Sequence, residues 1–219
     1  MLKPMFTRFV AFLAALTLLG SAAAPVPASA ARTERAVLAG GCFWGMEAVF
    51  ESLRGVKSVV SGFSGGRAVT AHYEIVSTGA TGHAESVEIT FDPAEISYEQ
   101  LLAVYFTVAH DPTELNRQGP DWGSQYRSTI FYTTEAQKRV AEETIAHLTA
   151  AKTYDAPIVT TVVPFVAFYP AEAYHQHYLE LHPDQPYIVE NDIPKLQQLR
   201  KRFPQLIKPN AVAITLTRS

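Results

Sequence analysis

The chain has a single cysteine among its 219 residues. One thiol cannot form an intramolecular disulfide, and it cannot build a structural zinc site that needs several cysteines. Only 18% of the residues are charged and the formal net charge is −3, which argues against a nucleic-acid-binding protein with a strongly basic surface. No H-E-x-x-H pattern occurs, and His175 and His177 are too close in sequence to share a helix face. The sequence therefore predicts neither a disulfide framework nor a metal site.

Residues 1–30 have the composition of an export signal. Lys3 and Arg8 stand at the start, an apolar run follows over residues 9–19, and small residues lead to an Ala-x-Ala site that ends at Ala30. This order is typical of a secretory signal peptide, and the run is shorter than the roughly 20 residues of a transmembrane helix. We expect cleavage after Ala30, export across the inner membrane to the periplasm, and no membrane anchor in the mature form. Residues 31–219 are long enough to form a single domain.

Apolar periodicity in the rest of the chain predicts both helices and strands. The expected strands are residues 35–39, 56–63, 83–91, 128–133 and 159–163, and the expected helices follow Cys42 or span 97–109, 134–152, 170–182 and 196–203. The helices at 97 and 134 should begin with capping boxes, and residues 113–125 should form a loop. Because the order has no strict βαβ rhythm, we expect an α+β fold with a mainly antiparallel sheet covered by helices.

The single cysteine, Cys42, stands in the sequence Gly40-Gly41-Cys42-Phe43-Trp44-Gly45, between an expected strand and an expected helix. The glycines allow a sharp turn and a close approach of a ligand to the backbone. A helix N-terminus is expected to lower the pKa of this thiol and so favour the nucleophilic thiolate. The alternative is a buried structural thiol. Phe43 and Trp44 either belong to the core or enclose a small apolar pocket beside the thiol.

Glu85 stands near the start of the expected strand at 83–91. Period-two alternation places it on the same strand face as Val87, Ile89 and Phe91. Burial on an apolar face raises the pKa of a carboxyl group, as a general acid near neutral pH requires. The alternative is a glutamate at the strand end that reaches solvent.

A polar segment at residues 121–128 leads from the expected loop into a strand. Loops held by regular structure often carry functional side chains. Tyr126 in this segment, and Tyr73, have phenol groups that can donate hydrogen bonds to a substrate oxygen. The alternative for either tyrosine is an ordinary half-buried aromatic residue.

Three signatures in this order resemble those of the A-type methionine sulfoxide reductases, the peptide-methionine (S)-S-oxide reductase family. They are Gly41-Cys42-Phe43-Trp44-Gly45, Gly82-His83-Ala84-Glu85 and Asp121-x-Gly123-Ser124-Gln125-Tyr126-Arg127-Ser128. The resemblance extends from about residue 36 to about residue 181. Many members have further cysteines near the C-terminus, whereas this chain resembles the single-cysteine form, here with a signal peptide. Trp122 departs from the pattern, because other members can carry histidine there.

The resemblance implies a two-layer α/β sandwich with a ferredoxin-like core and a mixed, mainly antiparallel sheet covered by helices. It implies a single catalytic domain at 31–219 that reduces methionine-S-sulfoxide, free or in proteins, and so repairs oxidative damage without a cofactor. Cys42 would attack the sulfoxide sulfur and become a sulfenic acid, while Glu85 would protonate or hydrogen-bond the oxygen. Tyr73 and Tyr126 would hold that oxygen. Asp121 would orient the polar side of the pocket, and Phe43 and Trp44 would enclose the methyl group.

Because the chain has no second thiol, the resemblance implies that an external thiol resolves the sulfenic acid. A thioredoxin-like protein or a small thiol would serve. Two other functions stay open on the residues alone. One is an envelope Cys-His amidase or transpeptidase that uses Cys42 with His83, for which an acyl adduct on Cys42 is diagnostic. The other is a non-enzymatic secreted binding domain in which Cys42 is buried and unreactive.

Overall fold

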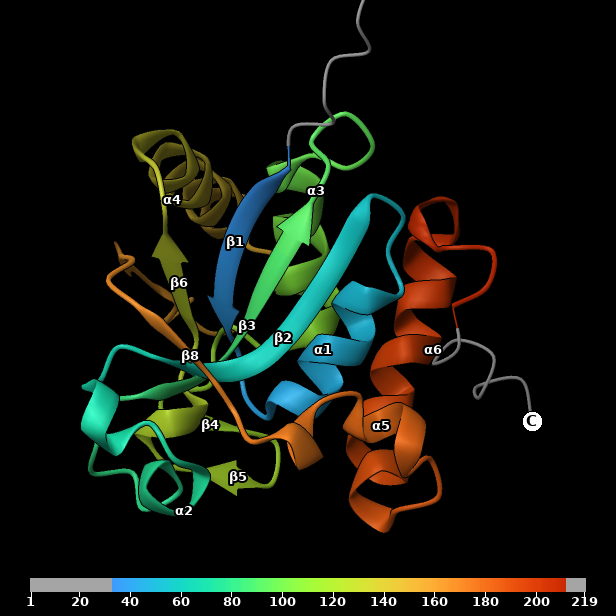
Figure 1. Ribbon diagram of the computed structural model, residues 1–219. Helices are drawn as coiled ribbons and strands as arrows, with labels where there is room; N and C mark the ends of the chain where they lie inside the picture. The colour runs from blue at the N-terminus through green and yellow to red at the C-terminus, as the bar shows by residue number, and fades with distance from the viewer. Residues whose placement is uncertain (1–32, 212–219) are drawn as a thin grey trace, which may run out of the picture. The chain divides into compact units, whose positions relative to one another are not determined.

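The computed structural model describes residues 33–211, so the expected signal peptide at 1–30 lies outside the described residues (Figure 1). The described residues belong to one compact unit. Its main sheet contains, in spatial order, β7 (Thr161–Pro164), β6 (Thr129–Tyr132), β1 (Glu34–Ala39), β3 (Ala84–Phe91), β2 (Val56–Ser64) and β8 (Phe168–Pro170). β6 and β7 run parallel, and every other neighbouring pair is antiparallel. The expected α+β class with a mixed, mainly antiparallel sheet is confirmed.

Helices pack against this sheet and against one another. They are α1 (Phe43–Glu51), α2 (Tyr73–Val76), α3 (Tyr98–Val104), α4 (Glu135–Ala150), α5 (Tyr178–Leu181) and α6 (Ile193–Arg202). α1 contacts β2 and β3 on one side and α6 on another, as Figure 1 shows, and α3 contacts α4. None of the described helices combines the length and the apolar character that crossing a membrane requires.

The face of β3 that α1 covers carries fully buried apolar side chains. Val87, Ile89 and Phe91 are all 0% exposed and belong to the main core cluster. Apolar side chains of this size each contribute about 1.5–3 kcal/mol when they are buried. α1 is therefore held against β3 by the core, and this contact sets the position of the residues at the start of the helix.

The helix expected at 170–182 is wrong. Pro170 ends β8, a 3₁₀ turn spans Ala173–His175, and α5 covers only Tyr178–Leu181. The cause is tertiary, because the side-chain amide of Gln176 pairs with both the N–H and the carbonyl of Ser61 in β2. His177 then takes a left-handed conformation with φ +53°, which a continuous helix does not allow.

The segment expected to be a loop at 113–125 contains a short two-stranded ribbon. β4 (Arg117–Gln118) pairs with β5 (Asp121–Trp122), and a 3₁₀ turn at Ser124–Tyr126 follows. Strands of two residues are too short to produce a periodic pattern in the sequence, which explains why the ribbon was not expected.

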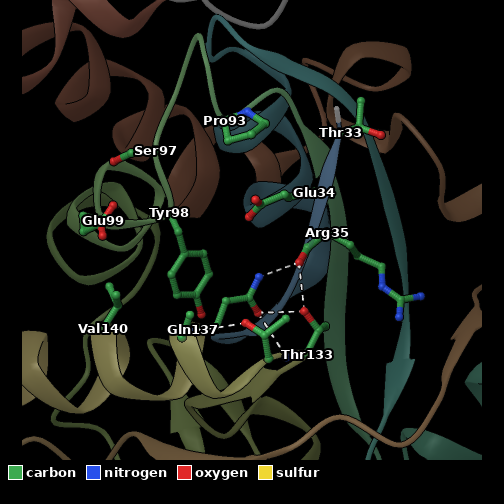
Figure 2. A pocket seen from close by; sticks show the side chains of 12 residues that line it. Thr33, Glu34, Arg35, Pro93, Ser97, Tyr98, Glu99, Thr133, Gln137 and Val140 are labelled. Atoms are coloured by element: carbon green, nitrogen blue, oxygen red, sulfur yellow. Dashed lines mark hydrogen bonds between the residues drawn. The ribbon is translucent and has the colours of Figure 1, made fainter. Parts of the chain in front are cut away.

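The two expected capping boxes differ in outcome. The box formed by Ser97 and Gln100 is complete, with both hydrogen bonds present. At α4, the Thr134 side chain accepts from the Gln137 N–H, but the Gln137 side chain does not return a bond to Thr134. Instead its oxygen accepts from Thr133, and its nitrogen donates to the carbonyl of Arg35 at 2.8 Å (Figure 2). Gln137 thus joins α4 to β1 and to the end of β6.

Figure 2 also shows the cavity beside this junction, which has a volume of about 520 Å³ and is lined by Tyr98, Arg35 and Thr133 among others. None of the site residues expected from the sequence lines it. The size of a cavity alone therefore does not locate the chemistry of this protein.

We predict that Gln137→Ala lowers the free energy of unfolding by about 2–3 kcal/mol, because it removes three partly buried hydrogen bonds, one to the carbonyl of Arg35 and two from the N–H and hydroxyl of Thr133. Urea unfolding followed by circular dichroism measures this change. Gln198→Ala is the matched control, since Gln198 is exposed on α6 and its loss should cost less than about 0.5 kcal/mol. Equal effects of the two substitutions would contradict the bridging role of Gln137.

Candidate active site

Cys42 stands at the N-cap of α1, and two glycines separate it from the end of β1. Gly41 makes this turn possible with φ +89°, and a Cβ there would lie 2.6 Å from the Gln118 side chain. Gly45 allows an equally close approach on the other side of the helix start, where a Cβ would lie 2.1 Å from an Asp192 oxygen. The glycines around Cys42 therefore let the β4–β5 ribbon and the start of α6 pack closely around the thiol.

The thiol of Cys42 is only 7% exposed, and burial raises its pKa well above the ordinary value of 9.0. The carboxyl groups of Glu85 and Asp192 raise the pKa further. A hydrogen bond from the Trp44 backbone and the charge of Lys195 lower it, but by less. The lowered pKa expected from the helix N-terminus is therefore wrong. The helix acts in the expected direction, but loss of hydration outweighs it.

Glu85 lies on the buried face of β3, as the alternation of the sequence predicts, and is 2% exposed. Its Oε2 accepts a hydrogen bond of 3.1 Å from the backbone N–H of Phe43, in the first turn of α1. Burial raises the pKa of Glu85 to about 8, the nearby Asp121 contributes in the same direction, and the bond from Phe43 opposes both. Glu85 is therefore mainly protonated at pH 7 and can donate a proton.

A cavity of about 270 Å³ brings the expected site residues together. Its lining contains all seven of them, contributed by α1, α2, β3, β5 and the turn after β5: Cys42, Phe43, Trp44, Tyr73, Glu85, Asp121 and Tyr126. Gln185 and Tyr187 complete the lining. Residues from distant parts of the sequence thus form one cavity that contains a thiol, a protonated carboxyl group, phenols and aromatic rings.

The aromatic side of the cavity is held by ring contacts. The Trp44 ring stacks on Tyr178 with centroids 3.8 Å apart and planes 8° apart, and its Nε1–H donates to His175 at 3.1 Å. Phe43 packs against Phe63 and His175. The segment that follows β8 therefore fixes the orientation of both aromatic residues beside Cys42.

Tyr73 and Tyr126 supply unpaired phenol groups. Burial and the nearby Glu85 raise the pKa of Tyr73 to about 12, and the same causes raise that of Tyr126 even more. Both hydroxyls therefore stay protonated. Within residues 33–211, no side chain or backbone group hydrogen-bonds either hydroxyl, so both can donate to a ligand in the cavity.

Sequence reasoning missed Tyr187 and Gln185. The Tyr187 hydroxyl donates to Asp121, and these two residues together with Cys42 also line a second cavity of about 450 Å³. Residues 183–187 precede α6 and show no periodic pattern, so only the tertiary structure reveals that they reach the site. The Asp121–Tyr187 pair therefore forms part of the boundary between two cavities that share the thiol.

Among residues 33–211, no histidine forms a hydrogen bond or ion pair with Cys42. His83 lines neither cavity, and its ring nitrogens contact backbone groups of Gly66 and Arg67. His110 lines the second cavity, but both ring nitrogens are bonded within the core and burial lowers its pKa to about 4. The arrangement therefore argues against the Cys-His amidase or transpeptidase.

Comparisons with known proteins give a consistent result. The model of the peptide methionine sulfoxide reductase family matches residues 34–207. The chain is 55% identical to a "Peptide methionine sulfoxide reductase MsrA 2" from Mesorhizobium japonicum over 83% of this chain and 93% of that protein. It is 52% identical to the protein of that name from Synechocystis, over 84% of this chain and 86% of that protein.

Solved structures show the same similarity. Reduced Mxr1 from Saccharomyces cerevisiae matches with a TM-score of 0.64 and 31% identity, over 71% of this chain and 89% of that one. Methionine sulfoxide reductase A of Corynebacterium diphtheriae matches with a TM-score of 0.61 and 34% identity, over 69% of this chain and 76% of that one.

We predict that alkylation of Cys42 by iodoacetamide follows an apparent pKa above 9.0, because the thiol is buried beside two carboxyl groups. The pH dependence of the alkylation rate, followed by mass spectrometry, measures this pKa. Glu85→Gln should lower it, since the substitution removes a negative charge that opposes the thiolate. Glu88→Gln, on the opposite face of β3, should leave it unchanged. An apparent pKa below 9.0 in the unaltered chain would contradict the burial argument.

Proposed function

We propose a mechanism for this chain, which belongs to the peptide methionine sulfoxide reductase family and is an oxidoreductase that reduces methionine sulfoxide. In this mechanism Cys42 is the nucleophile, Glu85 is the acid, and the S epimer of the sulfoxide is the substrate. The observation that carries the proposal is the single cavity that contains both groups, with the start of α1 hydrogen-bonded to Glu85. A thiol nucleophile and a protonated carboxyl group are the two functions that removal of a sulfoxide oxygen needs.

The lining of the cavity supports a role for each remaining residue. Phe43 and Trp44 present apolar surface that suits the S-methyl group of the substrate. The unpaired hydroxyls of Tyr73 and Tyr126 suit the sulfoxide oxygen, which accepts hydrogen bonds and carries partial negative charge. Asp121, held by Tyr187, keeps the opposite side of the cavity polar. An apolar and a polar side can together distinguish the two sulfoxide epimers, because the methyl group and the oxygen occupy defined positions.

The proposed reaction conserves atoms and electrons. Glu85 donates its proton to the sulfoxide oxygen, and the Cys42 sulfur forms a bond to the substrate sulfur while the thiol proton passes to the Glu85 carboxylate. The S–O bond and the new S–S bond of the substrate sulfur then break, while the protonated oxygen forms a bond to the Cys42 sulfur. Cys42 loses two electrons and becomes a sulfenic acid, while the sulfoxide gains two electrons and becomes the thioether of methionine. Glu85 ends the step protonated, as it began.

We propose that an external thiol completes the cycle, since the sequence contains no second cysteine. That thiol condenses with the sulfenic acid, releases water and leaves a mixed disulfide on Cys42. A second external thiol then attacks this disulfide and restores Cys42. A thioredoxin-like dithiol can supply both thiols from one molecule, and small thiols can supply them from two.

We also propose that the protein works outside the cytoplasm, in the periplasm. The support is the composition of residues 1–30, where a positive start, an apolar run and an Ala-x-Ala site follow in order. The N-terminal sequence of the protein recovered from a periplasmic extract tests the proposal, with cleavage after Ala30 as the expected result. Recovery of the uncleaved chain from the cytoplasm alone would contradict it.

We predict that Glu85→Gln lowers kcat/KM by about 10²- to 10⁴-fold, the range expected for the loss of a general acid. In the unaltered chain, kcat/KM should fall as pH rises through about 8, because Glu85 then loses the proton that it donates. Steady-state assays with a methionine-S-sulfoxide substrate and dithiothreitol between pH 6 and pH 10 measure both effects, as this range brackets the pKa. Glu88→Gln is the matched control and should keep both the rate and the pH profile.

We predict that one methionine forms per chain when the sulfoxide is added without a reductant, because the single thiol is then consumed as a sulfenic acid. Quantification of methionine, with dimedone labelling of Cys42, measures the stoichiometry. The S epimer should react and the R epimer should not. Undiminished reduction by Cys42→Ser, or reduction of the R epimer alone, would disprove the proposed mechanism.

A further inference from the structure

A cluster of ligand-type side chains lies outside both cavities at Cys42. Glu47 and Glu51, four residues apart on one face of α1, lie beside His177 at the N-cap of α5. One carboxylate oxygen of each glutamate and one ring nitrogen of His177 all lie within 4.8 Å of one another. His177 Nδ1 is 3.1 Å from a Glu51 oxygen, and the His177 backbone N–H donates to Glu47 at 3.0 Å.

Glu47 provides a second and independent observation. The residue is 1% exposed, and its Oε2 accepts from Ser61 Oγ and from the His177 N–H. Its Oε1 is buried and has no hydrogen-bond partner among the described residues. A buried oxygen left unpaired is costly, and in native structures such atoms are nearly always paired with a protein group, a water molecule or an ion. Because both oxygens belong to one carboxylate, the unpaired atom lies at this cluster.

We propose that Glu47, Glu51 and His177 form a binding site for a first-row transition-metal dication of the zinc class. One imidazole nitrogen and two carboxylate oxygens are ligands that Zn²⁺ accepts, with water in the fourth position. The imidazole favours such an ion over Mg²⁺ and Ca²⁺, which prefer oxygen ligands. The sequence predicted no metal site, because the spacing of the histidines does not reveal the contact between α1 and the segment after β8.

The charges around the cluster favour a cation. Glu180 adds a third carboxylate that acts on both His177 and Glu51, whereas the positive groups that act on Glu51 are His177 itself and Lys208. The carboxylates of Glu47 and Glu51 lie close together and repel each other when both are ionised. A dication bound between the two glutamates replaces this repulsion with attraction.

The site is accessible and connects two parts of the active-site wall. The side chain of His177 is 54% exposed and that of Glu51 is 19% exposed, so an ion can enter from solvent and reach the buried Glu47. His177 precedes Tyr178, which stacks on Trp44 in the lining of the cavity at Cys42. A bound ion therefore links the middle of α1 to the residue that supports Trp44, and it should stabilise the folded protein.

Isothermal titration of the full chain carrying Cys42→Ser with ZnCl₂ tests the proposal, since that background removes the thiol as a competing ligand. We expect one saturable ion per chain and an increase in Tm. His177→Asn keeps a residue that tolerates the left-handed conformation, and Glu51→Gln keeps the shape of the side chain. Each should weaken binding by more than the 10- to 100-fold that loss of an outer-shell partner typically costs.

Three controls separate this site from nonspecific binding. His147→Asn removes an exposed histidine of α4 and should leave the affinity unchanged. Ser61→Ala removes the partner of Glu47 and should weaken binding by about 10- to 100-fold. MgCl₂ should give no saturable binding. The proposal is overturned by the absence of saturable Zn²⁺ binding, by equal affinity in His177→Asn and the background chain, or by Mg²⁺ binding of equal affinity. Circular dichroism verifies that each variant is folded.

Discussion

The hydrogen bond from the Phe43 backbone to Glu85 is the interaction around which the active site is arranged. It joins the first turn of α1 to β3, two elements that are far apart in the sequence and share the main core. Because Cys42 directly precedes α1, the same bond fixes the thiol relative to the carboxyl group. The cavity needs both at once, since the proposed reaction delivers a proton to oxygen while sulfur attacks sulfur.

Burial of this pair has opposite consequences for stability and for chemistry. The pKa of Glu85 is raised to about 8 in the folded protein, so the folded state retains a proton that the unfolded chain loses above its ordinary value of 4.5. The contribution of Glu85 to folding is therefore most favourable below pH 4.5, and it declines as pH rises from there to about 8. A glutamine at this position avoids the loss but cannot donate the proton. The protein thus retains a destabilising acid where the proposed reaction uses it, as is common in active sites.

The sequence was a good guide wherever local pattern decides the structure. Period-two alternation placed Glu85 on the apolar face, and the glycine-framed sequence placed Cys42 at a helix start. The lowered pKa predicted for Cys42 was wrong, because a helix terminus is visible in the sequence whereas the depth of burial is not. The helix expected at 170–182 failed for a similar reason, since Gln176 binds Ser61, a residue more than one hundred positions away. Tyr187 was missed because nothing local links it to Asp121.

The failed helix and the missed Tyr187 share a physical origin in the segment between β8 and α6. The segment is short of regular structure, and several of its groups form hydrogen bonds with α1, β2 and β5. Through those contacts it holds Trp44 by stacking, Asp121 by a phenol and Glu47 by a backbone amide. Cys42 and Glu85 are positioned by α1 and β3, whereas Trp44 and Asp121 in the surrounding walls are held by this one segment. A change in how the segment packs therefore alters substrate binding before it alters the position of the thiol or the acid, and an ion at Glu47, Glu51 and His177 would act on the wall that carries Trp44 without touching the reacting groups.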